Sequence, residues 1–395
     1  MRAKVAIAVI AAVLLVTAVI LAVFLSRGSG APTNPTSRPS AAAGPPAPAS
    51  APYLVTVRCD GNASDAATLQ RAINGSPPGA IIDIQGGTCL LTQGISLPGD
   101  RTYTGGATTG TVLKQGAHLA YVLASAAYVG NSSTTGDPLA IRDLTVSCDG
   151  SGSTDGIIVL DWQTDVQHVD VSGCGGSGIV DTNTTANGQA ITNTSVNSRF
   201  DNNLISSSGR YGFEVSDSGN AVSDGFFEGN QIASSAKDAI HIDNAAGWVI
   251  SGNHVYGDHG DGIYADRLYG TTISDNYVED FGFGQHSGTW YGIAGAASGS
   301  IGSAISGNKV FNIRGETAGA RYIYVAVQAG GGQAGGGTGY VSVTGNVIAG
   351  TGRGDVGFLF GGGPQKLVVA SSGNVVTGVG TPRRNAGGVT VAGGI

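Results

Sequence analysis

A short sequence pattern returns six times along this chain and constrains its fold more than any other feature. An apolar residue is followed by two residues, an asparagine, one residue and another apolar residue, as in VISGNHV (249–255) and TISDNYV (272–278). A second apolar segment accompanies most copies, for example DAIHI (238–242) and DGIYA (261–265). The pattern asparagines, separated by 23, 23, 32, 38 and 28 residues, are Asn230, Asn253, Asn276, Asn308, Asn346 and Asn374. Short β segments that recur at one phase predict a parallel β-helix whose turns, or rungs, stack about 4.8 Å apart.

The composition agrees with such a coil. Glycine supplies 67 of the 395 residues, and helix interiors tolerate glycine poorly, which argues against a helical bundle. Glycine and asparagine accept the positive φ that sharp corners demand. Asparagines at one place on successive rungs are expected to hydrogen-bond along the stack, so we interpret them as structural. The formal charge of −7 and the pI near 5.2 argue against a nucleic-acid partner, which usually requires a basic surface.

The N-terminal segment predicts a membrane anchor. The run 5–25 has Thr17 as its only polar residue and is long enough to cross the ~30 Å hydrocarbon core as a helix. Arg2 and Lys4 precede it, which predicts a cytoplasmic N-terminus. Cleavage as a signal peptide, followed by secretion, is the alternative. We therefore expect a transmembrane segment at 1–26, a disordered Pro/Ala/Ser-rich linker at 27–52 and an extracytoplasmic β-helix domain at 53–395.

Four cysteines lie in the part of the chain that is expected outside the cytoplasm, where they could oxidise. They are Cys59, Cys89, Cys148 and Cys174. Sequence alone permits three pairings. Chain order favours Cys59 with Cys89 and Cys148 with Cys174, because the latter two are 26 residues apart, about one repeat. No pair has the short spacing of a metal site.

An open β-helix end exposes core and strand edges, so a cover is expected. The segment 64–73 predicts a capping helix: Ser64 can act as N-cap, and Ala66, Leu69 and Ile73 share one face. From this helix onward, the segment 60–105 resembles the opening of proteins in the pectin-lyase-like superfamily of right-handed β-helices. The resemblance implies an all-β, right-handed parallel β-helix with an N-terminal capping helix over 53–395. It also implies a polysaccharide ligand, often one that contains uronic acid.

Aligning the rungs predicts one candidate site. With Phe213, Ile240 and Ile263 pointing into the core, polar and charged residues crowd the outer face of the same three rungs. The candidate catalytic residues are His241, Tyr264, Glu214, Asp238 and Asp261. The candidate substrate-binding residues are Arg210, Lys237, Arg267 and Tyr211. For Asp238 and Asp261, binding of turn amides is the structural alternative.

Family motifs narrow the chemistry without settling it. The segment YGFEVS (211–216) resembles the Y-G-F-D-P-H motif of mannuronan epimerases and related alginate lyases, with Glu214 in place of the aspartate and Ser216 in place of the histidine. Those reactions share removal of the C5 proton of a uronate, for which we expect His241 or Tyr264 as base and acid. Of the polygalacturonase motifs only Asp238 matches, which disfavours hydrolysis of that type.

Two further expectations concern a cofactor and a second class of function. Asp243 and Asp266, one rung apart, could hold Ca²⁺, which prefers carboxylate oxygens. The residues favour a surface-anchored lyase or epimerase of an acidic polysaccharide. A noncatalytic glycan-binding or adhesion protein and a divergent polygalacturonase-type hydrolase are the alternatives, because the superfamily includes all of these. The oligomeric state stays open.

Overall fold

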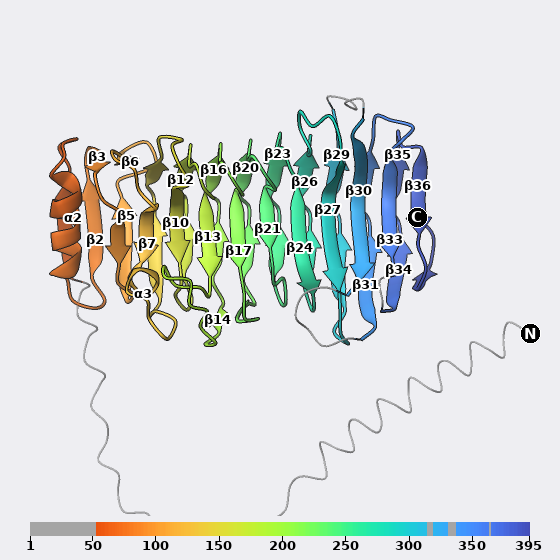
Figure 1. The fold of residues 1–395 in the computed structure, drawn as a ribbon, viewed down its shortest axis with the longest axis horizontal. Helices are drawn as coiled ribbons and strands as arrows, with labels where there is room; N and C mark the ends of the chain where they lie inside the picture. Colours follow the sequence, from red (N-terminus) through yellow and green to blue (C-terminus); the bar gives the residue numbers. More distant parts are fainter. Residues whose placement is uncertain (1–52, 314–318, 331–336, 363–364) are drawn as a thin grey trace, which may run out of the picture. The chain divides into compact units, whose positions relative to one another are not determined.

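The computed structural model describes residues 53–313, 319–330, 337–362 and 365–395. In these residues the chain winds as a parallel β-helix with three long sheets, here called sheets A, B and C (Figure 1). All strand pairs within the three sheets are parallel, and equivalent strands of successive rungs lie next to each other. The β-helix predicted from the repeat is therefore confirmed.

The strands recur in a fixed order around each rung. Sheet A contains β1 (Leu54–Arg58), β2 (Ile81–Gln85), β5 (Arg101–Gly105), β8 (Leu139–Arg142), β11 (Asp165–Gln167), β15 (Arg199–Asp201), β19 (Phe226–Glu228), β22 (Val249–Ser251), β25 (Thr272–Ser274), β28 (Ser303–Ser306), β31 (Gly339–Thr344), β34 (Leu367–Ser372) and β37 (Val389–Ala392). Sheet B contains β3 (Gly87–Leu91), β6 (Thr111–Gln115), β9 (Thr145–Ser147), β12 (Asp170–Ser172), β16 (Leu204–Ser206), β20 (Gln231–Ala233), β23 (His254–Tyr256), β26 (Tyr277–Glu279), β29 (Lys309–Phe311), β32 (Val347–Ala349) and β35 (Val375–Thr377). Sheet C contains β4 (Ile95–Leu97), β7 (Tyr121–Ser125), β10 (Asp155–Val159), β13 (Ile179–Thr182), β17 (Phe213–Ser216), β21 (Ile240–Ile242), β24 (Ile263–Leu268), β27 (Thr289–Ala297), β30 (Arg321–Ala329), β33 (Val356–Gly361) and β36 (Thr381–Asn385). A small separate sheet pairs β14 (Ser195–Val196) with β18 (Val222–Ser223).

The core is a column of inward-facing apolar side chains, one set from each sheet. Phe213, Ile240 and Ile263 are fully buried, as predicted. From sheets A and B, Ile250 and Val255 fill the same interior. Because successive residues of a strand point to opposite faces, this inward set leaves the neighbouring residues on the outer face.

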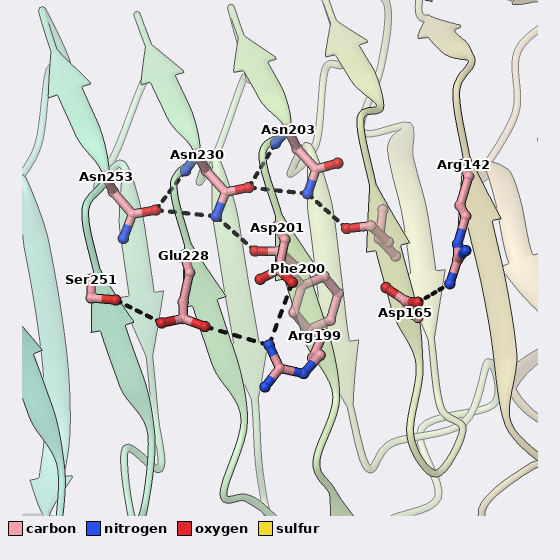
Figure 2. A network of polar contacts seen from close by, with 11 residues as sticks. Arg142, Asp165, Arg199, Phe200, Asp201, Asn203, Glu228, Asn230, Ser251 and Asn253 are labelled. Atoms are coloured by element: carbon pink, nitrogen blue, oxygen red, sulfur yellow. Dashed lines mark hydrogen bonds and ion pairs between the residues drawn. The ribbon is translucent and has the colours of Figure 1, made fainter. Parts of the chain in front are cut away.

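The asparagines of the repeat form a buried ladder at the corner between sheets A and B, as predicted (Figure 2). Asn253 donates its Nδ2 to the Phe227 carbonyl at 2.9 Å, and its Oδ1 accepts from Nδ2 of Asn230 at 3.1 Å. The same Oδ1 accepts from the Asn230 amide at 2.9 Å. The ladder also includes Asn203, which the sequence alignment did not contain, and continues to Asn374. Each of these side chains thus pairs with buried backbone groups of the preceding rung.

Breaking this ladder is expected to be costly. Asn253→Ala removes the acceptor for two buried donors of Asn230 and the donor for the Phe227 carbonyl. We expect the free energy of unfolding to fall by about 3–5 kcal/mol, since each buried polar group left unpaired costs about 1–3 kcal/mol. Urea unfolding of the full chain measures the change, and Asn74→Ala, at an exposed asparagine, is the control. A loss no larger than that of the control contradicts a stabilising role for the ladder.

The N-terminal end of the β-helix is covered by α2 (Asp65–Asn74), whose Ala66, Leu69 and Ile73 are fully buried. This confirms the predicted cap. The N-cap prediction was wrong in one detail: the Ser64 hydroxyl donates to Oδ1 of Asn62 at 2.7 Å rather than capping the helix. The carboxylate of Asp65 instead accepts three backbone N–H groups, from Asp60, Asn62 and Leu90. The second helix, α3 (Ala126–Val129), is a single short turn.

Both predicted disulfides are present. Cys59 joins Cys89 and Cys148 joins Cys174, with Cα atoms 4.9 and 4.7 Å apart. The first ties the residue after β1 to β3, and the second joins the ends of neighbouring strands β9 and β12. The cross-links therefore fasten the N-terminal rungs.

The predicted membrane anchor, 1–26, and the linker, 27–52, lie outside the described residues. In the part of the chain that the structure describes, no helix is both long enough and apolar enough to cross a membrane.

Candidate functional site

Three neighbouring strands of sheet C carry the row of outward residues that the rung alignment predicts. Glu214 on β17 pairs in register with His241 on β21, which pairs with Tyr264 on β24. The inner neighbours of these residues form the core, so the outer face of the sheet presents the row. The predicted register is therefore confirmed.

His241 lies at the centre of this row, held by contacts on four sides. Its Nδ1 is 2.7 Å from Oδ2 of Asp238, and its Nε2 is 3.3 Å from Oδ1 of Asp243. Its ring stacks between Tyr211, at a centroid distance of 4.1 Å, and Tyr264, at 4.8 Å. We call Tyr211, His241 and Tyr264 the histidine stack. The two carboxylates and the two rings fix the imidazole in one orientation.

The two flanking carboxylates set the protonation state of His241. Burial lowers its pKa, but the hydrogen bonds and charges of Asp238 and Asp243 outweigh burial and raise the pKa to about 9. At neutral pH the ring therefore carries a positive charge and donates from both nitrogens. This state favours a role as a fixed cation or proton donor over the role of base.

Tyr264 is also a proton donor at neutral pH. Burial raises the pKa of its phenol to about 12, and the nearby carboxylates, Asp266 first among them, act in the same direction. The neutral hydroxyl can therefore give a proton, whereas a tyrosinate base is strongly disfavoured.

Asp238 and Asp261 each bind a backbone amide of the next rung. Oδ1 of Asp238 accepts from the Asp261 amide at 2.9 Å, and Oδ1 of Asp261 accepts from the Tyr291 amide at 2.8 Å. Asp238 uses its second oxygen for His241. Burial and the charge of Asp238 raise the pKa of Asp261 to about 7. Asp261 can thus exchange a proton near neutrality.

A pocket of about 120 Å³ opens beside the stack. Its lining consists of Asp261, Tyr264, Tyr291, Ala294, Gly295, Ala296, Ala326 and Gln328. Pockets for whole small molecules are typically about 300–1,000 Å³, so this one suits a single substituent or the edge of one sugar ring. The proton donor Tyr264 and the titratable Asp261 both face this space.

Sequence reasoning missed Tyr291 and Gln328. Tyr291 stands in the segment YGIA (291–294), one rung beyond Asp261, so carrying the alignment one rung further would have found it. Gln328 lies in the nine-residue strand β30, where the repeat separation has widened. No repeat phase in the sequence marks that position.

Glu214 and Arg210 bind each other rather than facing open space. Nη2 of Arg210 lies 2.5 Å from Oε1 of Glu214, and the Ser177 hydroxyl donates to Oε2 at 2.6 Å. Glu214 is buried, and both of its carboxylate oxygens are occupied within the protein. This geometry argues against the catalytic role expected for Glu214 and the substrate-binding role expected for Arg210. Lys237, in contrast, places its Nζ 5.3 Å from the Tyr211 ring centre, beside the stack.

Arg267 and Asp243, one of the two proposed calcium ligands, contact other residues of the protein. Arg267 has a φ of 56° and donates to Oδ1 of Asn244 at 2.8 Å and to Asn220. Its guanidinium therefore serves a turn at the end of the sheet. Asp243 contacts His241. Among the described residues, no group of three or more His, Cys, Asp or Glu is arranged to hold a metal ion. The calcium expectation for Asp243 and Asp266 stays a prediction.

Comparison with known protein families identifies the type of β-helix. The family described as "Right handed beta helix region" matches residues 144–348. No curated protein matches the sequence.

Several solved structures share the architecture. The A-module of the mannuronan C-5 epimerase AlgE6 of Azotobacter vinelandii is 18% identical, with a TM-score of 0.56 over 85% of this chain and 97% of that one. The AlgE4 A-module of the same organism is 17% identical, with a TM-score of 0.53 and the same coverages. The Dettilon tailspike protein is 11% identical, with a TM-score of 0.53 over 82% of this chain and 68% of that one. At these identities the likeness concerns the fold.

Proposed function

The chain belongs to the right-handed β-helix family, within the pectin-lyase-like superfamily, and from that premise we propose that it is an enzyme acting on a uronate-containing polysaccharide. The proposed reaction begins with removal of the C5 proton of a uronate and continues as epimerisation or β-elimination. Two solved structures of similar fold are named mannuronan C-5 epimerases. Mannuronan is itself a uronate polymer, which supports this class of substrate.

One observation carries the proposal. Asp261 and Tyr264 line the same pocket, and their environments bring the pKa of the acid to about 7 and that of the phenol to about 12. Two titratable groups at one pocket with separated pKa values are the usual arrangement of a base and an acid. His241, a cation at neutral pH, lies against Tyr264. The site thus combines a base, a proton donor and a positive charge.

These groups take distinct roles in the proposed reaction. Ionised Asp261 removes the C5 proton, and the electron pair of the C5–H bond moves into the uronate carboxylate. His241 and Lys237 stabilise the dianion that forms, because a fixed positive charge at developing negative charge lowers the barrier. In elimination, the C4–O4 bond then breaks, a C4–C5 double bond forms and Tyr264 protonates the departing oxygen. In epimerisation, the C4–O4 bond stays intact and Tyr264 instead gives its proton to C5 on the face opposite Asp261.

Exchange in heavy water tests this proposal. The full chain is incubated in D₂O with mannuronan, polygalacturonate and other polyuronates, and the products are read by NMR. We expect deuterium at C5 or unsaturated chain ends with at least one polymer. If neither signal is detected with any polymer of the panel, the proposal is contradicted. Shortened chains with saturated ends indicate a hydrolase instead, and repetition with a chelator tests the calcium prediction.

A noncatalytic glycan-binding protein is the second candidate. The polar contacts of His241 and Glu214 favour it, since both nitrogens of His241 and both carboxylate oxygens of Glu214 already have partners within the protein. Binding of a polyuronate without exchange or cleavage supports this candidate. For either function we propose an extracytoplasmic location. The two disulfides support that location, because such cross-links persist in oxidising compartments.

A further inference from the structure

A row of aromatic side chains lies on the outer face of sheet B, away from the strands that carry the histidine stack. His254 and Tyr256 come from β23, Tyr277 from β26 and Phe311 from β29. The ring centres of His254 and Tyr277 are 4.8 Å apart with their planes at 85°, and those of Tyr277 and Phe311 are 4.8 Å apart with their planes at 89°. Together with Lys309 on β29, these residues are here called the aromatic face.

The aromatic face is partly open to solvent, chiefly at Tyr277, His254 and Lys309. Tyr277 is 37% exposed, and the side chain of His254 is 44% exposed. In register with Tyr277 follow Lys309, Val347 and Val375, of which the two valines are 42% and 52% exposed. Scattered exposed apolar groups are ordinary, but a continuous exposed row marks an interaction surface.

These rings are not needed to fill the core. The middle residues of the same strands, Val255, Val278 and Val310, point inward and are fully buried. Because a strand alternates its faces, the aromatic residues on either side of them stand on the outside. They contact one another edge to face on the surface, outside the core.

The chemistry of the face fits a sugar chain. A pyranose presents an apolar C–H face that stacks on aromatic rings and a polar edge that meets hydroxyl and charged groups. The row advances one rung at a time, about 4.8 Å, and the repeat of a linear pyranose chain is of similar length. The cores of protein interfaces are depleted of lysine and glutamate, whereas Lys309 and Glu279 lie directly among these rings. A second copy of the chain is therefore the weaker occupant.

Lys309 adds a charge that the protein does not use. On sheet A two arginines form ion pairs, Arg142 with Asp165 and Arg199 with Glu228 (Figure 2). Lys309 is exposed and has no ion pair within the described residues. An unpaired cation beside aromatic rings is complementary to a sugar carboxylate.

We propose that the aromatic face is a second polysaccharide-binding surface, separate from the pocket on sheet C, which stacks a pyranose ring on Tyr277 and binds a uronate carboxylate with Lys309. The choice of an acidic sugar rests on the proposed function. The surface holds the polymer along the β-helix axis while another part of the same chain occupies the pocket.

Retention of the full chain in native gels that contain mannuronan or polygalacturonate tests this proposal. Tyr277→Ala and Lys309→Ala are each expected to weaken the apparent affinity about fivefold to tenfold, as the loss of one stacking or charge contact implies. The matched control is Tyr340→Ala, at a tyrosine that is 43% exposed on sheet A. Its retention is expected to equal that of the wild type. Because the readout is binding, the two proposals can be told apart: a chain whose retention falls in Tyr277→Ala and Lys309→Ala but which catalyses no exchange supports this surface and contradicts the proposed function.

Three results overturn the proposal. The first is a wild-type chain that neither polymer gel retains. The second is retention of Tyr277→Ala and Lys309→Ala that equals that of Tyr340→Ala. The third is a wild-type chain that sediments as an oligomer while Tyr277→Ala sediments as a monomer with unchanged retention, which assigns the face to contacts between copies.

Discussion

Replacement of Asp261 by asparagine is expected to lower the rate of C5 proton exchange by about 10²–10⁴-fold, the usual contribution of a positioned general base. The amide oxygen of asparagine can still accept the Tyr291 amide, which Oδ1 of Asp261 binds at 2.8 Å, so the fold of the rung is preserved. The variant loses only the ability to take a proton. Deuterium incorporation at C5, followed by NMR, measures the effect.

The matched control is Asp155→Asn. Asp155 occupies the equivalent position on β10, and its Oδ1 accepts the Ser177 amide at 2.6 Å, as Asp261 accepts that of Tyr291. It does not line the pocket. We expect this variant to retain the wild-type exchange rate. Equal losses in Asp155→Asn and Asp261→Asn contradict the assignment, because they indicate a structural role for this column of carboxylates.

The pH profile gives an independent check of the same assignment. Exchange by the wild type should rise with pH through about 7, as Asp261 loses its proton. It should fall above about 9, as His241 loses its charge. The result is a bell-shaped curve. If the residual exchange rate of Asp261→Asn still rises with pH through about 7, that rise belongs to a group other than Asp261.

The folded chain is expected to be more stable in mild acid than at neutral pH. Burial raises the pKa of Asp161 to about 7 and that of Asp258 to about 7. Burial also raises the pKa of Asp181 well above its usual range, and the charges of Asp161 and Asp217 act in the same direction. These carboxyls bind protons more tightly in the folded state than in the unfolded state, so stability declines as pH rises from about 4 to 7. Asp161 and Asp258 each contribute on the order of a few kcal/mol.

His241 changes stability in the same direction at higher pH. Its folded-state pKa lies above the unfolded value, so its contribution to the free energy of unfolding is complete below about pH 6.5 and is lost as pH rises through about 9.

Urea unfolding of the full chain at pH 5 and pH 8 measures the combined effect of these groups. We expect a lower unfolding free energy at the higher pH, by several kcal/mol.

Asp181→Asn tests the source of this pH dependence. An amide is similar in shape to the protonated acid and does not ionise, so the variant should lose less stability than the wild type between the two pH values. Asp60→Asn, which changes an exposed carboxyl near the N-terminal cap, is the control and should behave as the wild type. A wild-type chain that gains stability as pH rises contradicts the buried-acid explanation.

The repeat predicted most of the architecture because it records contacts between rungs directly. Asn230, Asn253 and Asn276 recur every 23 residues, one rung apart, and each bonds the next. The same period placed His241 beside Tyr264, since a parallel register follows once the rung length is known. The disulfide pairing followed for a similar reason: Cys148 and Cys174 are about one rung apart in sequence.

The electrostatics of the candidate site could not be read in this way. The alignment put His241 or Tyr264 forward as base and acid without deciding between them, but the positions of Asp238 and Asp243 around the ring make His241 a cation at neutral pH. It put Arg267 forward as a substrate-binding residue, whereas its guanidinium donates to Asn244 and Asn220. Proton affinity depends on burial and on interatomic distances, which residue spacing does not contain.

For this protein, residue order alone specifies the coil, its register and the side of each strand that faces the core, because a periodic chain must repeat its contacts. The three-dimensional packing settles which outward groups meet. It closes a pocket with Tyr291 and Gln328, and it leaves Tyr277 and Lys309 exposed on another sheet. The physical reason is that backbone periodicity fixes Cα positions rung by rung, whereas corner torsions and side-chain burial, which decide charge and access, vary from one rung to the next.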